Sequence, residues 1–170
     1  MTITPVTTGS EVVDVLRQFH RSIADRTGKL EIVDTVASFA RDTFDAASVT
    51  VNHTDHVRGF YRSVVNVGRL GPGESFHPEA ETYGFDEYPF TTMTLLAGRG
   101  FRSDLTDPEC PAEYEQLLRR LGKAACLGAP IRRQGTLLGE LWLSRDRPFG
   151  DHDVDLLSAL GAATAKYLAA

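Results

Sequence analysis

One acidic residue in an otherwise apolar segment is the first feature of the sequence that could do chemistry. Glu140 lies in Thr136–Leu143, two residues before Trp142, the one tryptophan of the chain. The apolar residues of this segment alternate with period two and occupy both faces, which indicates a β-strand inside a covered sheet. A carboxyl group on a covered face must find a partner or titrate at a raised pH. Glu140 is therefore the sharpest candidate for orienting a ligand.

Aromatic side chains are concentrated between residues 60 and 101. Ligand pockets are mostly apolar with a few placed polar groups, so this segment predicts either a pocket wall or a collapsed core that fills the same space. Thr94, Arg102 and Asp104 join Glu140 as polar residues that could orient a ligand. The full set of predicted pocket residues is Tyr61, Phe76, Tyr88, Phe90, Met93, Thr94, Phe101, Arg102, Asp104, Tyr114, Glu140 and Trp142.

The sequence lacks the arrangements that covalent or metal catalysis needs. Cys126 lies on a predicted strand and reads as a small buried hydrophobe, while Cys110 has acidic neighbours and no nearby cation to lower its thiol pKa. No Gly-x-Ser-x-Gly element follows a strand, and no histidine has a spacing typical of zinc. We expect no catalytic residue and no metal ligand; a disulfide between the two cysteines stays open.

Composition limits the class of protein. The chain has 170 residues, 42% hydrophobic and 24% charged, with a net charge of -5. These values predict an N-terminal arm over residues 1–8 and a single globular domain over residues 9–170. The acidic balance argues against unspecific nucleic-acid binding, and no apolar run approaches the ~18 residues of a membrane span. With no secretory signal visible, we expect a cytoplasmic protein without a nucleic-acid or membrane partner.

Periodicity predicts an alternation of helices and strands. Thr8 and Glu11 fit a capping box that opens a first helix to about Arg26. The remaining predicted elements are a helix Leu30–Phe44, strands Ala47–His53 and Val57–Val67, a long loop Arg69–Phe85, a short helix from Pro89, a strand Phe101–Leu105, a helix Ala112–Leu121, strands Ala125–Ile131 and Thr136–Leu143, and a final helix after Phe149. The final helix is apolar over more than half its circumference, which indicates a contact with another helix.

This order of elements, with the residues of the second half, resembles the GAF domain family. The resemblance rests on Leu127-Gly128-Ala129-Pro130-Ile131, Leu138-Gly139-Glu140-Leu141, Pro148-Phe149 and Asp153-Val154-Asp155-Leu156-Leu157. It implies an α+β fold with a central antiparallel sheet of about five or six strands. It also implies that the N- and C-terminal helices pack on one face, with loops and short helices over a pocket on the other.

The best-marked ligand classes of that family carry motifs that this sequence lacks. Bilin-binding members attach the chromophore to a cysteine within the helix before the late strands, whereas Cys110 precedes that helix. Haem-binding members place a histidine in the region that here reads Arg119-Arg120-Leu121-Gly122-Lys123. Cyclic-nucleotide members have an Asn-Lys pair where this chain has Ser144-Arg145. We therefore expect neither haem nor bilin and assign no other cofactor.

The resemblance implies a sensory or regulatory domain in signal transduction. In this interpretation an unidentified small molecule fills the pocket and biases a homodimer formed through the first and last helices, without catalysis. An output domain or partner protein would receive the signal. The alternative is a dimerisation or protein-interaction module with a vestigial pocket, and an enzyme is a third possibility.

Overall fold

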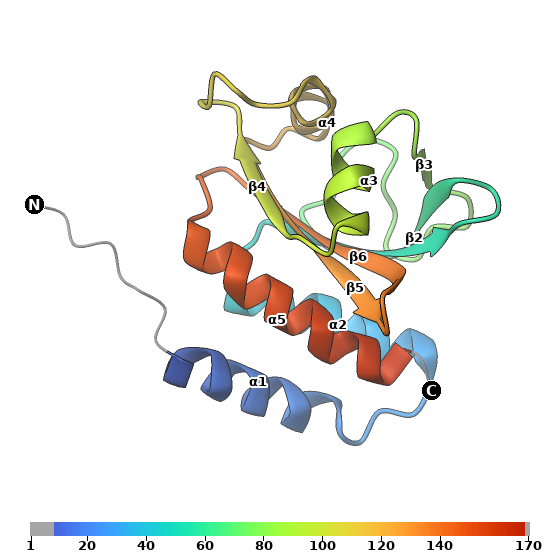
Figure 1. The fold of residues 1–170 in the computed structure, drawn as a ribbon, viewed down its shortest axis with the longest axis vertical. Helices are drawn as coiled ribbons and strands as arrows, with labels where there is room; N and C mark the ends of the chain where they lie inside the picture. The colour runs from blue at the N-terminus through green and yellow to red at the C-terminus, as the bar shows by residue number, and fades with distance from the viewer. Residues whose placement is uncertain (1–8, 169–170) are drawn as a thin grey trace, which may run out of the picture.

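The computed structural model describes residues 9–168, and Figure 1 shows how its elements are arranged. The helices are α1 (Gly9–Ile23), α2 (Lys29–Thr43), α3 (Pro89–Leu96), α4 (Ala112–Leu121) and α5 (Asp151–Leu168). The strands are β1 (Ser48–Asp55), β2 (Phe60–Gly68), β3 (Thr82–Gly84), β4 (Phe101–Asp104), β5 (Ala125–Arg133) and β6 (Thr136–Arg145). Within residues 9–168, no helix is both long and apolar enough to cross a bilayer.

The strands form one antiparallel sheet in the order β3-β2-β1-β6-β5-β4. This confirms the predicted α+β architecture and its strand number. Strands β5 and β6 are joined by a tight turn in which Gln134 and Gly135 have φ of 50° and 82°. Two consecutive residues with positive φ match the right-handed twist of a hairpin, and glycine takes this conformation without strain. The predicted hairpin therefore lies inside the sheet, between β1 and β4.

The terminal helices cover one face of the sheet, as Figure 1 shows. Helix α5 packs on β5, α2 packs on β1 and β2, and α1 lies against α2 and α5 on the side away from the sheet. Phe19 and Ile23 of α1 and Leu157 and Leu160 of α5 are completely or almost completely buried. The wide apolar surface of α5 is thus used within the chain, because the sheet covers one side and two helices cover another.

Helices α3 and α4 lie over the opposite face of the sheet, and the short strand β3 extends its edge beside β2 (Figure 1). A second apolar cluster fills the space between these helices and the sheet. Its core residues are Tyr61, Leu95, Phe101, Tyr114, Leu117, Leu118, Leu121, Cys126, Leu137 and Trp142. Both faces of the central strands are therefore closed to water, as the apolar pattern of β5 and β6 predicts.

Two β-bulges interrupt the strict alternation that the sequence predicts. Leu138 has no pairing partner on β5, because Ile131 pairs with Gly139 and Arg132 with Leu137. Leu138 therefore packs with the helix-side cluster, while Leu137 packs on the opposite side. Val64 is the extra residue of β2 in its pairing with β1. A bulge inserts one unpaired residue and reverses the facing of those beyond it, which periodicity alone does not reveal.

Several boundaries differ from the prediction. The predicted long loop contains β3, which pairs with the start of β2 although only three residues are involved. Helix α1 ends at Ile23 rather than Arg26, since Ile23 is its last residue buried in the core. Strand β2 begins at Phe60 because the Asp55 carboxylate accepts hydrogen bonds from the backbone amides of residues 57 and 58 and fixes the turn. The predicted cap residue Thr8 lies outside the described residues.

We predict that Gly161→Ala destabilises the chain. An added Cβ would lie 2.4 Å from the carbonyl oxygen of Pro130, because α5 packs closely on β5 at this point. Alanine normally stabilises a helix by about 1 kcal/mol relative to glycine, whereas overpacking costs about 1–3 kcal/mol. Urea denaturation should therefore give a lower free energy of unfolding. Ala162→Gly, at the exposed neighbouring position, measures how much the helix propensity of alanine over glycine contributes to the free energy of unfolding. A neutral or stabilising effect of Gly161→Ala would contradict the close packing.

Candidate functional site

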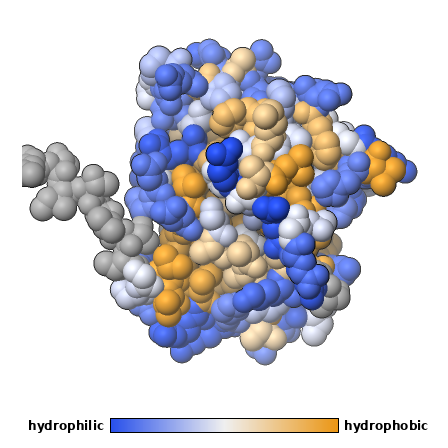
Figure 2. Space-filling model, viewed as in Figure 1, coloured by the Kyte–Doolittle hydropathy of each residue, from blue (hydrophilic) through white to orange (hydrophobic). Residues whose placement is uncertain are grey.

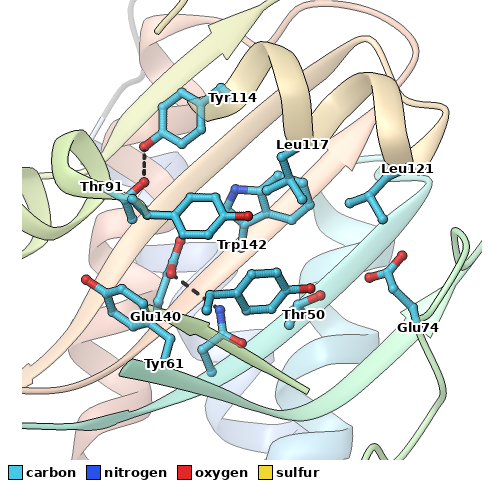
Figure 3. A pocket seen from close by; sticks show the side chains of 12 residues that line it. Thr50, Tyr61, Glu74, Thr91, Tyr114, Leu117, Leu121, Glu140 and Trp142 are labelled. Atoms are coloured by element: carbon cyan, nitrogen blue, oxygen red, sulfur yellow. Dashed lines mark hydrogen bonds between the residues drawn. The ribbon is translucent and has the colours of Figure 1, made fainter. Parts of the chain in front are cut away.

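A small cavity lies on the face of the sheet opposite the terminal helices. It has a volume of about 30 Å³, which is room for about two water molecules. It is lined by Thr50, Asn52, Tyr61, Glu74, Tyr83, Tyr88, Thr91, Tyr114, Leu117, Leu121, Glu140 and Trp142, shown in Figure 3. The sheet supplies its floor, α3 and α4 supply one wall, and the segment from β2 to α3 supplies the other.

Glu140 is the ionisable group at the centre of this cavity. Its side chain is 3% exposed, and Figure 3 shows its carboxyl group among the side chains of Tyr61, Tyr114 and Trp142. Oε2 accepts a long hydrogen bond of 3.4 Å from Nδ2 of Asn52, while Oε1 has no hydrogen-bond partner. Burial raises the pKa of Glu140 to about 8, and the nearby Glu113 adds to the increase. At neutral pH the group is therefore mainly a neutral acid.

A buried polar network connects Glu140 to the segment between β2 and β3. Oδ1 of Asn52 lies 3.0 Å from the Ser63 hydroxyl, which also lies 2.9 Å from Oε1 of Glu81. The other carboxylate oxygen of Glu81 accepts a hydrogen bond of 3.0 Å from Nδ2 of Asn66. The hydroxyl of Tyr83 donates to Glu81 at 2.7 Å. Glu81 thus ties this segment to β2 and to the cavity wall.

Helix α4 supplies the N-terminal cap that α3 lacks. Tyr88 precedes α3 without a side-chain cap, and Glu113 of α4 instead accepts hydrogen bonds from the Phe90 amide and from the Thr91 amide and hydroxyl. The hydroxyl of Thr91 lies 2.6 Å from that of Tyr114. A carboxylate at a helix N-terminus satisfies free amides and is favoured by the helix dipole. Glu113 therefore fixes the cavity wall that carries Thr91 and Tyr114.

The tyrosine hydroxyls of the cavity are neutral. Burial raises the pKa of Tyr61, Tyr83 and Tyr114 above the ordinary phenol value. Burial likewise raises the pKa of the Cys126 thiol, which belongs to the apolar cluster on the cavity side of the sheet. Both Cys126 and Cys110 are free. The cavity therefore presents neutral phenols and aromatic ring faces around its carboxyl groups.

The structure brings five of the predicted pocket residues together around the cavity: Tyr61, Tyr88, Tyr114, Glu140 and Trp142. Phe76, Phe90 and Met93 are instead 49%, 45% and 74% exposed, because they lie on the outer sides of their segments. Whether a ligand contacts any of these residues stays a prediction.

The other four predicted residues lie outside the cavity lining and have local roles. Phe101 stacks on the ring of Tyr114 at 5.1 Å, so it supports the cavity wall. Arg102 pairs with Asp151, and Asp104 accepts hydrogen bonds from the amide and hydroxyl of Thr106. Thr94 is buried in α3.

Seven lining residues are absent from the predicted set: Thr50, Asn52, Glu74, Tyr83, Thr91, Leu117 and Leu121. Thr50 and Asn52 carry a usable signal, since they alternate with Val49 and Val51 and so share the strand face that the terminal helices do not cover. Glu74 has no such signal, because its segment has no periodicity.

Within residues 9–168, no three His, Cys, Asp or Glu side chains gather in a way that could hold a metal ion.

An antiparallel sheet with terminal helices on one face and a small cavity beneath short helices on the other is the architecture of small sensory-type domains. The GAF domain model matches residues 29–168, so the chain belongs to the GAF domain family. Helix α1 lies outside the matched range. A comparison with curated protein sequences gives no match.

Solved structures share this fold at low sequence identity. The GAF domain of a phosphoenolpyruvate-protein phosphotransferase from Coxiella burnetii is 18% identical, with a TM-score of 0.74 over 96% of this chain and 95% of that chain. The chromophore-binding domain of Stigmatella aurantiaca phytochrome P1 is 11% identical, with a TM-score of 0.78 over 100% of this chain and 63% of that one. The PixJ GAF domain of Thermosynechococcus elongatus is 18% identical, with a TM-score of 0.63 over 96% and 89%.

We predict that Glu140→Gln removes a specific pH dependence of stability. The folded protein holds a proton on Glu140 up to a pKa of about 8, whereas the unfolded chain releases it near 4.5. The free energy of unfolding of the wild type, relative to Glu140→Gln, should therefore fall by about 1.4 kcal/mol per pH unit between about pH 5 and 8, and level off above 8. Urea denaturation across this range measures the difference. The exposed Glu115→Gln should follow the wild type, and parallel curves for Glu140→Gln would contradict the buried acid.

Proposed function

We propose that the chain is a sensory or regulatory domain that binds a small molecule in the cavity around Glu140 and performs no catalysis. The observation that supports this function is the buried carboxyl group whose Oε1 has no partner within the described residues. Buried polar atoms are almost always satisfied, so an orphaned one that faces a cavity marks a site where another molecule can complete the hydrogen bonding. Two of the similar structures add support, because they come from a phytochrome and from PixJ.

The size of the cavity limits what it binds in this conformation. Sites for drug-sized ligands have volumes of about 300–1,000 Å³, far above the about 30 Å³ found here. A ligand of more than a few non-hydrogen atoms needs the segment of residues 69–81 to move outward. Contacts hold this segment at both ends: Glu81 bonds to Ser63 and Asn66, and Arg69 pairs with Asp146. Between these ends, His77 pairs with Asp34, so the movement has to break several contacts. In this proposal, ligand binding and movement of that segment occur together.

The small cavity also favours a second candidate function. A GAF-fold module for dimerisation or protein interaction needs no ligand, and its cavity would hold only water. The two functions differ in one measurable respect. A binding domain is stabilised by its ligand, whereas a module with a vestigial pocket is not.

We predict that a member of a broad metabolite library raises the melting temperature of the wild type. At a concentration 100 times its dissociation constant, a ligand contributes about 2.7 kcal/mol, or roughly 5–10 °C for a chain of this size. Leu117→Phe, which fills the cavity, should abolish the shift, and Gln116→Phe on the exposed side of α4 should preserve it. The absence of any shift would favour the vestigial pocket, and a shift that survives Leu117→Phe would place the ligand elsewhere.

We further propose that the chain forms a homodimer through the outer face of α1. Leu160 and the other apolar residues of α5 are used in the core, so α5 offers less free apolar surface than its sequence suggests. The apolar patch at the start of α1, visible in Figure 2, includes Val13, which is 52% exposed. Val12 and Leu16 beside it are only partly buried. Apolar helix surface of this kind is commonly covered by a second subunit.

We predict that Val13→Glu converts the dimer to a monomer, because it places a charge in the apolar contact. Sedimentation equilibrium should show the mass halved relative to the wild type. Val57→Glu is the matched control, since Val57 is 97% exposed in the turn between β1 and β2 and far from α1. A monomeric wild type, or an unchanged mass for Val13→Glu, would exclude α1 as the dimer contact.

A further inference from the structure

Most hydroxyl protons around the cavity are already donated to other protein groups. Thr50 donates to Asn66 at 2.6 Å, and Tyr61 donates to Thr92 at 3.1 Å. Tyr83 donates to Glu81 at 2.7 Å. Thr91 donates to Glu113, and its short contact with Tyr114 then uses the Tyr114 proton. Apart from the proton that Glu140 itself carries below its pKa of about 8, the cavity therefore offers a ligand oxygen lone pairs and few free O–H donors.

The ionisable groups that line the cavity, apart from its tyrosines, are both carboxyl groups. Glu140 and Glu74 line it, and none of the lining residues that the structure describes is Lys, Arg or His. The two carboxyl groups differ in their surroundings. Burial raises the pKa of Glu74, and the nearby Lys123 and Arg120 oppose part of that increase. The charged group that acts on Glu140 is Glu113, which is a like charge.

Aromatic rings surround the unpaired carboxyl group. Tyr61, Tyr83, Tyr88, Tyr114 and Trp142 all line the same cavity, and Figure 3 shows Glu140 between Tyr61 and Trp142. The face of an aromatic ring is negative and attracts cations, most strongly for tryptophan. An anionic ligand would meet these ring faces, two carboxyl groups and few donors. A cationic ligand would meet aromatic rings and the oxygens of Glu140, with the positive charges of Lys123 and Arg120 on the side of the cavity where Glu74 lies.

We propose that the cavity binds a small organic ammonium ion, whose N–H groups donate to Oε1 of Glu140 and whose charge lies against the surrounding aromatic rings. This inference rests on the proposed function, of which it names the ligand class. In the observed conformation the volume of about 30 Å³ suits an ion of about two non-hydrogen atoms. A larger alkylammonium ion requires the outward movement of residues 69–81.

Ammonium binding must compete with a proton for Glu140. The titratable groups that face Glu140 are Tyr61 of β2, Glu113 and Tyr114 of α4, and Cys126 of β5. Burial raises the pKa of Tyr61, Tyr114 and Cys126, so each of these stays neutral well above pH 7. With a pKa of about 8, Glu140 is about one-tenth ionised at pH 7 and nine-tenths at pH 9. Affinity for the cation should therefore rise about tenfold between these values.

The test uses the single tryptophan as the reporter. Trp142 lines the cavity and gives the one indole N–H signal of the chain in an ¹⁵N-correlated NMR spectrum. The full chain is titrated at constant ionic strength with methylammonium chloride, methanol and sodium formate, which are similar in size and differ in charge. Methylammonium keeps its proton at pH 9, because alkylammonium groups titrate near 10.4. We expect a saturable shift with methylammonium alone, and about tenfold tighter binding at pH 9 than at pH 7.

Variants separate the charge of Glu140 from the fold. Glu140→Gln should weaken methylammonium binding at least tenfold at pH 9 and remove its pH dependence, while the exposed Glu115→Gln keeps both. If Glu140→Gln does not fold, the pH dependence in the wild type is the deciding measurement. Equal binding of methanol or formate, pH-independent binding, or retained affinity in Glu140→Gln would overturn the proposal.

The failure of this inference can be told from failure of the proposed function. If methylammonium does not bind but an uncharged or anionic metabolite stabilises the wild type and not Leu117→Phe, the site is a ligand site for another class and only the ammonium inference is wrong. If compounds of all three charge classes fail, both the inference and the binding function are wrong.

Discussion

Both faces of the central strands are closed to water, and the rest of the structure follows from that constraint. On one face the terminal helices bring enough apolar surface to form a mainly hydrophobic core. On the other face Thr50, Asn52, Ser63, Asn66 and Glu140 are buried. Because a buried polar group without a partner is costly, these side chains must bond with one another, and they do so in pairs across β1, β2 and β6. The cavity lies beside Oε1 of Glu140, the carboxyl oxygen that this pairing leaves without a partner.

Much of this arrangement could be predicted from the sequence. The β5–β6 hairpin follows from two apolar runs separated by Gln134-Gly135, and the two-sided cover follows from the apolar residues on both faces of those runs. Glu140 stands out for the same reason, because a single acid on a covered strand has few ways to be satisfied. These signals are local, and each depends on spacing within about ten residues of the chain.

The remaining features depend on contacts between distant segments. The bulges at Val64 and Leu138 are set by pairing with β1 and β5, so a strict period of two assigns Leu138 to the wrong face. The segment of residues 69–81 has no periodicity and is positioned by contacts with distant residues. Glu81 bonds to residues of β2 and β3, Arg69 pairs with Asp146 and His77 with Asp34. Aromatic composition alone also cannot distinguish Tyr88, which lines the cavity, from Phe90, which is half exposed and lies outside the lining.

The polar network gives the cavity a direct physical connection to the segment that closes it. Asn52 donates to Glu140 through its amide nitrogen and faces Ser63 through its oxygen. The Ser63 hydroxyl has one proton and two acceptors, the oxygens of Asn52 and Glu81, so it can donate fully to only one of them. An ionised Glu140 polarises the Asn52 amide and makes its oxygen a better acceptor, which draws the Ser63 proton away from Glu81. The charge state of Glu140 therefore affects one of the contacts at the end of this segment, the hydrogen bond from Ser63 to Glu81, because Asn52 and Glu81 share this one hydroxyl group.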